Sequence, residues 1–213
     1  MKVHDTNDPG CRRMSTINLA GFLARSSVNG PGIRSVVWVQ GCPLHCEGCF
    51  NPQFLPFTPA QKVTHSTLAK RIFAQEPIDG VTFSGGEPFA QADALGDLGE
   101  RLQHHGLSIV TFTGFSPEHV LLSTRPAWRR LIAVTDLLIA GPYIPSLKCN
   151  IPWIGSSNQR IIPLTNTITQ SGHDSAISGQ VAEFTIHANG TLTATGFPDG
   201  QFVEALAHRC RGV

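Results

Sequence analysis

The stretch that decides the fold is Gly41–Pro52, read as Gly-Cys-Pro-Leu-His-Cys-Glu-Gly-Cys-Phe-Asn-Pro, which places Cys42, Cys46 and Cys49 in a C-x3-C-x2-C pattern. These are three of the six cysteines in the chain. Thiolates at this spacing can converge on one soft metal centre without help from distant segments. Three ligands suit a cubane iron–sulfur cluster with one iron left open, whereas a closed structural site needs four. The pattern predicts a metal centre with one vacant position.

The same cysteines allow two other interpretations. They could hold a structural zinc with His45, Cys11, Cys149 or a distant histidine as the fourth ligand, or they could be ordinary loop thiols. Zinc sites usually pair two well-separated knuckles. The chain has one C-x2-C half and no second Cys/His pair at that spacing. The spacing favours a cluster but leaves a zinc-stabilised binding module open.

Composition sets the class of protein. The 213 residues are 41% hydrophobic and 15% charged, with a net charge of +1, which fits one globular domain without a broad basic face for nucleic acid. The N-terminal MKVHDTNDPG lacks the apolar run of a signal peptide, and no stretch reaches the roughly 18 apolar residues of a membrane span. We expect a cytoplasmic protein that binds neither nucleic acid nor membrane and whose thiols stay reduced.

Short apolar runs alternate with segments of helical spacing. Tight connections between them favour a parallel α/β sheet. The expected helices are 64–75, the segment carrying Leu95, Leu98 and Leu102, a short helix after Ser116, and 127–134; the expected strands are 35–40, 80–83, 107–112 and 137–140, with a possible edge strand at 15–23.

Unusual residues follow the ends of these strands. The cysteine run, Ser84–Pro88, Thr113-Gly114 and Gly141-Pro142 each come directly after a predicted strand. Because the carboxyl ends of parallel strands meet at one edge of a sheet, four separate stretches should converge on one mouth. The sequence therefore predicts a site at that edge.

The Ser-Gly-Gly-Glu-Pro turn at 84–88 has an ordinary and a chemical interpretation. Consecutive glycines are common in turns, and Glu87 could be a solvated side chain. Alternatively, Gly85 and Gly86 would let backbone carbonyls approach an ammonium group closely, with Glu87 helping to hold a cation. The shared edge with the cysteines favours the second interpretation.

The remaining segments are expected to be less regular, and residues 145–180 are expected to be irregular. Residues 1–14 should form a flexible tail, and 15–165 the α/β domain. In 166–213 a loop leads to a hairpin, since Asn189-Gly190 separates two β-prone runs, 181–187 and 191–195, and a closing helix is expected at 201–209.

These motifs together resemble the radical S-adenosylmethionine superfamily, which carries a C-x3-C-x2-C run after its first core strand and Gly-Gly-Glu-Pro after the second. The chain is most similar to the glycyl-radical-activating branch, in particular the activating proteins of anaerobic ribonucleoside-triphosphate reductases. The matching stretches are spread, in the right order, over about 130 residues. They are Val28–Gly32, Gly41–Asn51, Ser84–Pro88, Phe112–Gly114, Asp136–Ile139, Trp153 and Gly155–Gln159. The resemblance implies an open or partial (βα) barrel, to which the C-terminal hairpin is added.

The resemblance also implies roles by position. Cys42, Cys46 and Cys49 would ligate three irons of a [4Fe-4S] cluster, and S-adenosylmethionine would chelate the fourth. Gly48, Cys49 and Phe50 would lie along that cofactor, with Phe50 near its adenine. The other implied cofactor contacts are Gly85, Gly86 at the methionine amino group, Glu87, Thr113 and Asp136.

The implied activity is that of an anaerobic oxidoreductase. A flavodoxin- or ferredoxin-type reductant would supply an electron, S-adenosylmethionine would yield a 5′-deoxyadenosyl radical, and that radical would take hydrogen from a glycine of a partner enzyme. The partner would be anaerobic ribonucleoside-triphosphate reductase; the alternatives are a pyruvate formate-lyase type enzyme, a peptide or a small molecule. A simple iron–sulfur electron carrier would normally have four cysteines and no need for the glycine turn.

Some residues depart from the pattern of the branch or stand outside it. Ala140 stands where the branch often has Asp, and Ile154 where an Arg is often seen. Gly48 before the third cysteine differs from most of the superfamily but is shared by the activating branch. Cys11, Cys149 and Cys210 follow no ligand spacing and are interpreted as structural or incidental thiols.

Overall fold

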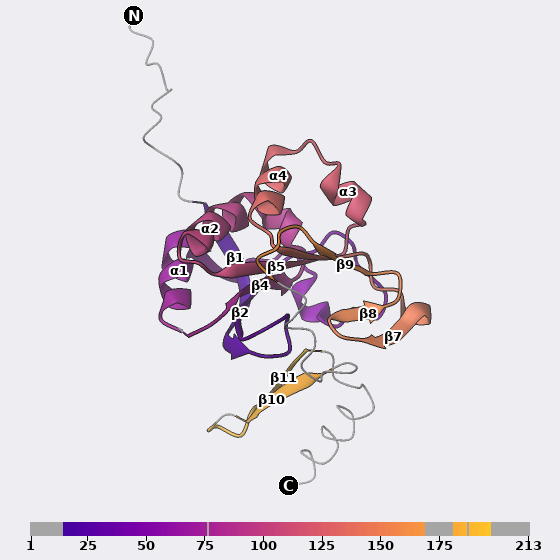
Figure 1. The fold of residues 1–213 in the computed structure, drawn as a ribbon. Helices are drawn as coiled ribbons and strands as arrows, with labels where there is room; N and C mark the ends of the chain where they lie inside the picture. Colours follow the sequence, from indigo (N-terminus) through magenta and orange to yellow (C-terminus); the bar gives the residue numbers. More distant parts are fainter. Residues whose placement is uncertain (1–14, 76, 169–180, 187, 197–213) are drawn as a thin grey trace, which may run out of the picture.

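The computed structural model describes residues 15–75, 77–168, 181–186 and 188–196. Its centre is a seven-stranded sheet in the order β3-β1-β2-β4-β5-β6-β9 (Figure 1). The strands are β1 (Thr16–Ser26), β2 (Arg34–Val39), β3 (Gln61–Thr64), β4 (Gly80–Gly85), β5 (Ser108–Thr113), β6 (Leu137–Ala140) and β9 (Arg160–Pro163).

The four central strands are parallel. β2 pairs with β4, β4 with β5, and β5 with β6, while β1 and β9 flank this block in antiparallel pairs. This arrangement confirms the predicted parallel α/β sheet in the form of an open, partial barrel. The carboxyl ends of the four parallel strands lie at one edge, which we call the carboxyl edge, and the opposite one is the amino edge.

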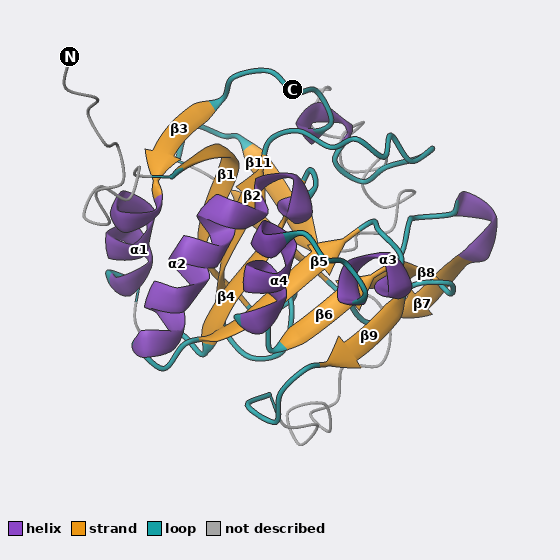
Figure 2. Cartoon of the chain, turned by 90° about the horizontal axis from the view of Figure 1, so that it is seen from above, coloured by secondary structure: helices purple, strands orange, loops and turns teal. Residues whose placement is uncertain are grey.

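Helices cover one face of the sheet, as Figure 2 shows for α1, α2 and α4. Their apolar sides pack with alternate strand residues in a single core that includes Leu68, Leu95 and Leu131. The side chain of Thr64 accepts a hydrogen bond from the Thr67 N–H and caps α1. The helices are α1 (His65–Phe73), α2 (Ala92–His104), α3 (Pro117–Leu121) and α4 (Pro126–Ala133).

The other face of the sheet carries a smaller apolar cluster around Val110, Ile139 and Trp153. Trp153 joins β7 (Lys148–Ile151) to β8 (Ile154–Ser156), a two-stranded ribbon outside the main sheet. Short 3-10 turns occur at Pro52–Phe54 (η1), Pro88–Gln91 (η2) and Pro145–Leu147 (η3).

Two sequence expectations about strands are wrong. β1 is not an edge strand, because β3 pairs along it, and the segment after residue 145 contains β7, β8 and β9 instead of being irregular. β3, β7 and β9 are four residues long and largely exposed. Strands of that kind carry no hydrophobic alternation strong enough to predict them.

The predicted C-terminal hairpin is present. β10 (Ala182–Ile186) and β11 (Leu192–Gly196) pair antiparallel, with Phe184 opposite Ala194. The expected tail at 1–14, the expected helix at 201–209, Cys11 and Cys210 lie outside the described residues. Among the helices that the structure describes, none is long and apolar enough to cross a membrane.

Candidate iron–sulfur and cofactor site

The cysteine loop is fixed to the carboxyl edge by its own backbone. The Gly41 N–H donates to the Phe54 carbonyl at 2.8 Å, and the Cys42 N–H donates to the Leu55 carbonyl at 2.9 Å. Gly41 has a φ of 100°, which only glycine adopts easily, so the chain can turn sharply where β2 ends. The loop therefore leaves the sheet and returns through η1 as a closed unit.

The three cysteines of this loop are free thiols. Cys42 is buried, and Cys46 and Cys49 are partly buried. Burial raises the pKa of Cys42, with backbone N–H groups of Leu44 and His45 opposing the rise. Burial likewise raises the pKa of Cys49, against a hydrogen bond from the Asn51 N–H to its Sγ at 3.4 Å.

The three thiols influence one another electrostatically. The charge of Cys46 contributes to the raised pKa of both Cys42 and Cys49. Thiolates gathered in a partly buried loop repel one another, and a bound cation relieves that repulsion and displaces the protons. Backbone N–H groups directed at sulfur are also how proteins tune iron–sulfur clusters. The loop thus fits a cluster held by three cysteines.

A single metal ion would need a tighter arrangement. In the part of the chain that the structure describes, no three His, Cys, Asp or Glu side chains are placed to hold one ion together. A cubane cluster needs its ligands farther apart, because each cysteine binds a different iron.

The glycine turn after β4 packs directly on the cysteine loop. The Gly86 N–H donates to the Val39 carbonyl at 2.7 Å, and the Glu87 N–H donates to the Gly41 carbonyl at 2.9 Å. A Cβ atom on Gly86 would lie 2.4 Å from the Gly41 carbonyl oxygen, so no other residue fits without movement. The predicted meeting of these two stretches at one edge is therefore confirmed.

Glu87 does not face a ligand as a solvated or cation-holding side chain. It is fully buried, and one carboxylate oxygen accepts from the Phe89 N–H and the Thr113 hydroxyl, both at 2.9 Å. The other oxygen accepts from the Gly114 N–H at 2.9 Å. Burial raises the pKa of Glu87 to about 7, against the three hydrogen bonds that favour the ionised form. Glu87 and Thr113 tie the ends of β4 and β5 together beside the cysteine loop.

Asp136 is not at this edge. It precedes β6 at the amino edge, where its carboxylate accepts from the Ile109 N–H at 2.7 Å and the Thr165 hydroxyl at 2.6 Å. The sequence expectation that Asp136 contacts the cofactor is therefore corrected. Its side chain joins β5, β6 and the segment after β9 and is 3% exposed.

Gly48 and Phe50 lie against aromatic and proline residues from another part of the chain. The rings of Phe50 and Tyr143 have centroids 4.9 Å apart. Gly48 has a φ of 66°, and a Cβ there would lie 3.4 Å from both Tyr143 and Pro145. Tyr143, which follows Gly141-Pro142, is a site residue that sequence reasoning missed.

A cavity of about 500 Å³ extends from Phe50 over the face of the sheet that the helices do not cover. Its floor is formed by side chains of β2, β4 and β5, namely Trp38, Ser84 and Phe112. Gln159 lines one side and is held in place, since its side chain accepts from the Gly155 N–H and donates to the Gly141 carbonyl. The remaining lining residues are Gly21, Phe22, Leu23, Asn29, Asn51, Gln53, Phe54, Tyr143, Trp153, Thr185, Thr193, Ala194, Thr195 and Gly196.

Comparison with known proteins identifies the class. Residues 28–162 match the family model described as a 4Fe-4S single cluster domain, and the chain belongs to this family. Together with the relatives below, this match confirms the resemblance to the radical S-adenosylmethionine superfamily and its activating branch.

Several curated proteins are similar to the chain. A pyruvate formate-lyase-activating enzyme from Clostridium pasteurianum is 38% identical over 85 residues, which are 38% of this chain and 36% of that protein. The anaerobic ribonucleoside-triphosphate reductase-activating protein of Enterobacteria phage T4 is 29% identical over 140 residues, covering 63% of this chain and 86% of that protein. A pyruvate formate-lyase-activating enzyme from Staphylococcus aureus is 36% identical over 119 residues, 53% of this chain and 47% of that protein.

The chain thus spans about a third to a half of the pyruvate formate-lyase-activating enzymes that it matches. Among solved structures, QueE from Escherichia coli aligns with a TM-score of 0.37 at 19% identity, over 48% of this chain and 53% of that one. A likeness of this size carries no weight for the fold or the function.

Proposed function

We propose that the chain is a radical S-adenosylmethionine enzyme that generates a glycyl radical on a partner protein. Cys42, Cys46 and Cys49 would hold three irons of the [4Fe-4S] cluster and leave the fourth to S-adenosylmethionine. The observation that carries this proposal is the packing of the Gly85-Gly86 turn on the backbone of the cysteine loop. When bound, the cluster supplies the electron that splits the cofactor into methionine and a 5′-deoxyadenosyl radical.

The residues of the carboxyl edge would bind and orient the cofactor. In the proposal, Gly85 and Gly86 bring backbone close to the methionine amino group, since neither carries a side chain to block it. Gly48, Cys49 and Phe50 would lie along the cofactor, with Phe50 beside the adenine, and Tyr143 is added because it packs on Phe50. Glu87 and Thr113 act as positioning residues that hold the turn rigid.

The cavity floor supports the proposed radical chemistry. Trp38, Phe112 and Trp153 surround the space next to Phe50 with aromatic surface. An apolar wall limits the water that could react with or reorganise around an intermediate. The target glycine would enter this cavity from the partner.

We further propose anaerobic ribonucleoside-triphosphate reductase as the partner, with a pyruvate formate-lyase type enzyme as the alternative. The length covered favours the first, since the match takes in 86% of the phage activating protein but 36% and 47% of the two others. A flavodoxin- or ferredoxin-type protein would supply the electron. We place the chain in the cytoplasm, because thiols that bind iron have to stay reduced.

The test begins with anaerobic reconstitution of the full chain. We expect a brown protein with about four irons per chain, which releases 5′-deoxyadenosine when dithionite and S-adenosylmethionine are added. Electron paramagnetic resonance then shows a glycyl radical after addition of purified anaerobic ribonucleoside-triphosphate reductase from the same organism, and less or none with pyruvate formate-lyase. A colourless protein with one zinc and no nucleoside release would contradict the proposal and support the zinc-stabilised module.

A further inference from the structure

The segment that leads from the cysteine loop back to β3, residues 52–60, is rich in proline and mostly exposed. We call it the return segment. It begins Pro-Gln-Phe-Leu-Pro-Phe-Thr-Pro, and none of the three residues of η1 is buried. Proline has no N–H to donate, so such a segment pairs poorly along a neighbouring strand, and exposed side chains add little by burial. The position of the return segment therefore depends largely on hydrogen bonds to its carbonyl groups.

Gln40, which directly follows β2, supplies two of these hydrogen bonds. Its side-chain amide nitrogen donates to the Pro56 carbonyl at 2.8 Å and to the Gln53 carbonyl at 3.3 Å. Both donors of the amide are thus used on the return segment, and Gln40 is only 8% exposed. Carbonyl groups that lose a donor away from water are costly to leave unpaired. Gln40 therefore ties η1 to the end of β2.

Two further amide side chains hold Gln40 in place. Gln91 in η2 donates to the carbonyl oxygens of Gln40 at 3.0 Å and of Asn18 at 3.1 Å, and it accepts from the Asn18 N–H at 2.7 Å. The Gln40 N–H donates to the Asn18 carbonyl at 2.8 Å. The Asn18 side chain donates to the Thr58 carbonyl at 2.9 Å and accepts from the Ala60 N–H at 2.8 Å. The three amides form one network that runs from β1 to the base of the cysteine loop.

The η1 turn supports both ends of the cysteine run. Where the turn starts, the Asn51 carbonyl accepts from the Phe54 N–H at 2.9 Å, and the Asn51 N–H donates to the Cys49 sulfur at 3.4 Å. Where it ends, the Leu55 carbonyl accepts from the Cys42 N–H at 2.9 Å. Cys42 and Cys49 are the first and third of the proposed ligands. One short turn thus sets their positions relative to each other.

A cubane cluster is sensitive to that spacing. Its three cysteines must reach three different irons at once, so a loop that already has the right shape loses less conformational entropy when the cluster binds. Hydrogen bonds to the sulfurs also help to set the reduction potential of such a cluster. The amide network therefore bears on both the retention and the potential of a cluster in this loop.

We propose that Gln40 is a positioning residue of the iron–sulfur site, which fixes the separation of Cys42 and Cys49 through η1, with Asn18 and Gln91 as its supports. The proposal rests on the proposed function for the identity of the cluster. It gives a role to a residue that the sequence pattern presents only as the last position before the cysteine loop.

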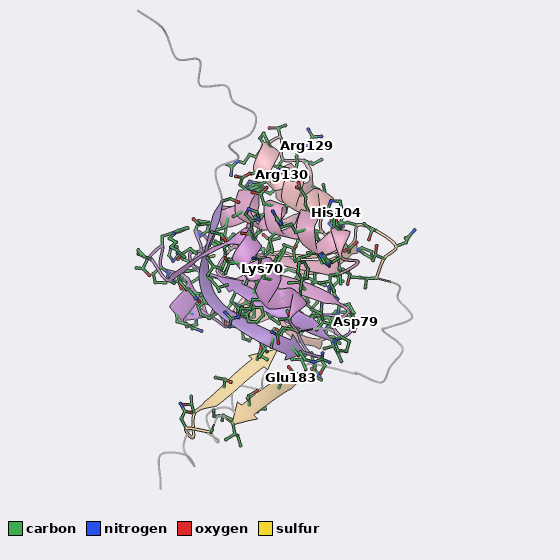
Figure 3. All side chains as sticks on the ribbon, turned by 90° about the vertical axis from the view of Figure 1, so that its left-hand side faces the viewer. Lys70, Asp79, His104, Arg129, Arg130 and Glu183 are labelled. Carbon is green, nitrogen blue, oxygen red and sulfur yellow. The ribbon has the colours of Figure 1, made fainter. Side chains whose placement is uncertain are left out.

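The first experiment measures retention of the cluster after anaerobic reconstitution. Gln40→Met keeps the length of the side chain and removes both donors, and Gln103→Met is the matched control. Gln103 also donates to a backbone carbonyl, that of Val134 at 3.2 Å, but it lies near the end of α2 beside His104, which Figure 3 labels among the helices. We expect Gln40→Met to release iron to the chelator EDTA about tenfold faster than the wild type, because two hydrogen bonds are lost. Gln103→Met should release iron at the wild-type rate.

The second experiment reads the reduction potential of the cluster that stays bound. Loosening η1 should weaken the hydrogen bond from the Asn51 N–H to the Cys49 sulfur, and a less hydrogen-bonded sulfur favours the oxidised cluster. Titration followed by electron paramagnetic resonance should therefore give a more negative potential for Gln40→Met than for the wild type. A role confined to overall stability would leave the potential unchanged, as we expect for Gln103→Met.

A variant on β1 keeps the proposal testable if Gln40→Met does not fold, which circular dichroism would show. Asn18→Leu has a similar shape and removes the side-chain bonds to Thr58 and Ala60, farther along the return segment. Because η1 keeps its bonds to Gln40 in this variant, iron release should be about threefold faster than in the wild type.

Opposite results would overturn the proposal. It is wrong if folded Gln40→Met keeps either the wild-type rate of iron release or the wild-type potential, or if Gln103→Met changes both equally. If Gln40→Met does not fold, wild-type iron release by Asn18→Leu would overturn it in the same way. A wild-type chain that takes up no iron–sulfur cluster would instead contradict the proposed function, because Gln40 would then have no cluster to position.

Discussion

The two edges of the central sheet bury charged side chains in opposite ways. At the amino edge, the Arg34 guanidinium donates to the carbonyl oxygens of Pro31, Val81 and Ser108. At the carboxyl edge, the Glu87 carboxylate accepts from two backbone N–H groups and the Thr113 hydroxyl. Both side chains are at most 1% exposed, so burial dominates the pKa of each.

The difference lies in the charges around them. Burial lowers the pKa of Arg34 to about 10, and the carboxylates of Asp136 and Asp79 oppose this, so the amino edge balances its own charge. Glu87 has only neutral donors, and its charge contributes to the raised pKa of Cys42. Among the described residues, no cation contributes to the pKa of Glu87, Cys42 or Cys49, and a bound iron cluster would supply that positive charge. The amino edge balances its charges with its own side chains, whereas in our proposal the carboxyl edge does so with the bound cluster.

Removing one proposed cluster ligand at the carboxyl edge should have the largest effect of all the substitutions considered. Cys46→Ala is expected to abolish both iron incorporation as a stable cluster and release of 5′-deoxyadenosine, because two thiolates cannot hold the cubane. The urea midpoint of the protein without metal should change little, since Cys46 is partly buried in a loop outside the core.

Cys149→Ala is the matched control for this prediction. Cys149 is also a partly buried cysteine, but it lies on β7 and not in the cysteine loop. The Cys149→Ala protein should load about four irons, as we expect of the wild type. Equal loss of iron in the two variants would show that cysteine content, and not the loop, determines binding.

A substitution at the amino edge should lower the stability of the protein without changing its iron content. Arg34→Met removes donors from three buried carbonyl groups and leaves Asp136 without its neighbouring cation, which should lower the free energy of unfolding by about 3 kcal/mol. Urea denaturation measures the loss. Iron content per folded chain should stay at the wild-type value, because Arg34 lies at the edge remote from the cysteines.

Arg25→Met provides the comparison. Arg25 is an exposed arginine that donates to the carbonyls of Gln75 and Pro77, and its loss should cost less than about 1 kcal/mol. Similar costs at Arg25 and Arg34 would mean that the buried network at the amino edge contributes no special stability.

The contrast between the edges also explains what the sequence could predict. The cysteine run and the glycine turn are local patterns, and their meeting follows from the rule for parallel strands. The burial of Glu87 depends on donors at and just after the end of β5, 26 and 27 residues away, and no local sequence pattern indicates them. Asp136 shows the limit of that rule, because it precedes β6 and so lies at the amino edge, where it accepts from the Ile109 N–H.

The hairpin shows the same division between local and distant information. Asn189-Gly190 predicts the turn, and the β-prone runs beside it predict the strands. The hydrogen bond from the Ser27 N–H to the Glu183 carboxylate, which ties the hairpin to the loop before β2, joins residues 156 positions apart in the chain. That contact can only be seen once the chain is folded.

Comparing the stability of Glu87→Gln with that of the wild type at two pH values should reveal the raised pKa of the buried Glu87 carboxyl. A carboxyl whose pKa rises on folding, here from 4.5 to about 7, binds a proton in the native state that the unfolded state has released. Its contribution to stability is thus fully present below pH 4.5 and declines, by about 1 kcal/mol per unit, as pH rises to 7. Glutamine does not titrate, so the wild type should exceed the variant in stability more at pH 5 than at pH 7.5.

Urea midpoints of both proteins at the two pH values measure this difference. At either pH the glutamine amide turns a donor toward the N–H of Phe89 or Gly114, which should cost about 1–2 kcal/mol. A gap between the proteins that widens from pH 5 to pH 7.5 would contradict the raised pKa and show that the site already supplies a cation.

The smallest expected effects come from two glycines in left-handed backbone, one at each edge of the sheet. Gly48 in the cysteine loop has a φ of 66°, and Gly106 after α2, at the amino edge, has a φ of 76°. A Cβ on Gly48 would be 3.4 Å from its neighbours and one on Gly106 would meet nothing within 4 Å, so alanine is limited mainly by the backbone at both positions.

Gly48→Ala and Gly106→Ala should each lower the free energy of unfolding by about 1 kcal/mol, the cost of placing a side chain in left-handed backbone. Only Gly48→Ala should also raise the concentration of S-adenosylmethionine needed for half-maximal 5′-deoxyadenosine release, because Gly48 lies in the loop proposed to run along the cofactor. Thermal unfolding and cofactor titration of the reconstituted proteins measure the two effects. Equal cofactor requirements in the two variants would remove Gly48 from the binding site and leave it a turn residue like Gly106.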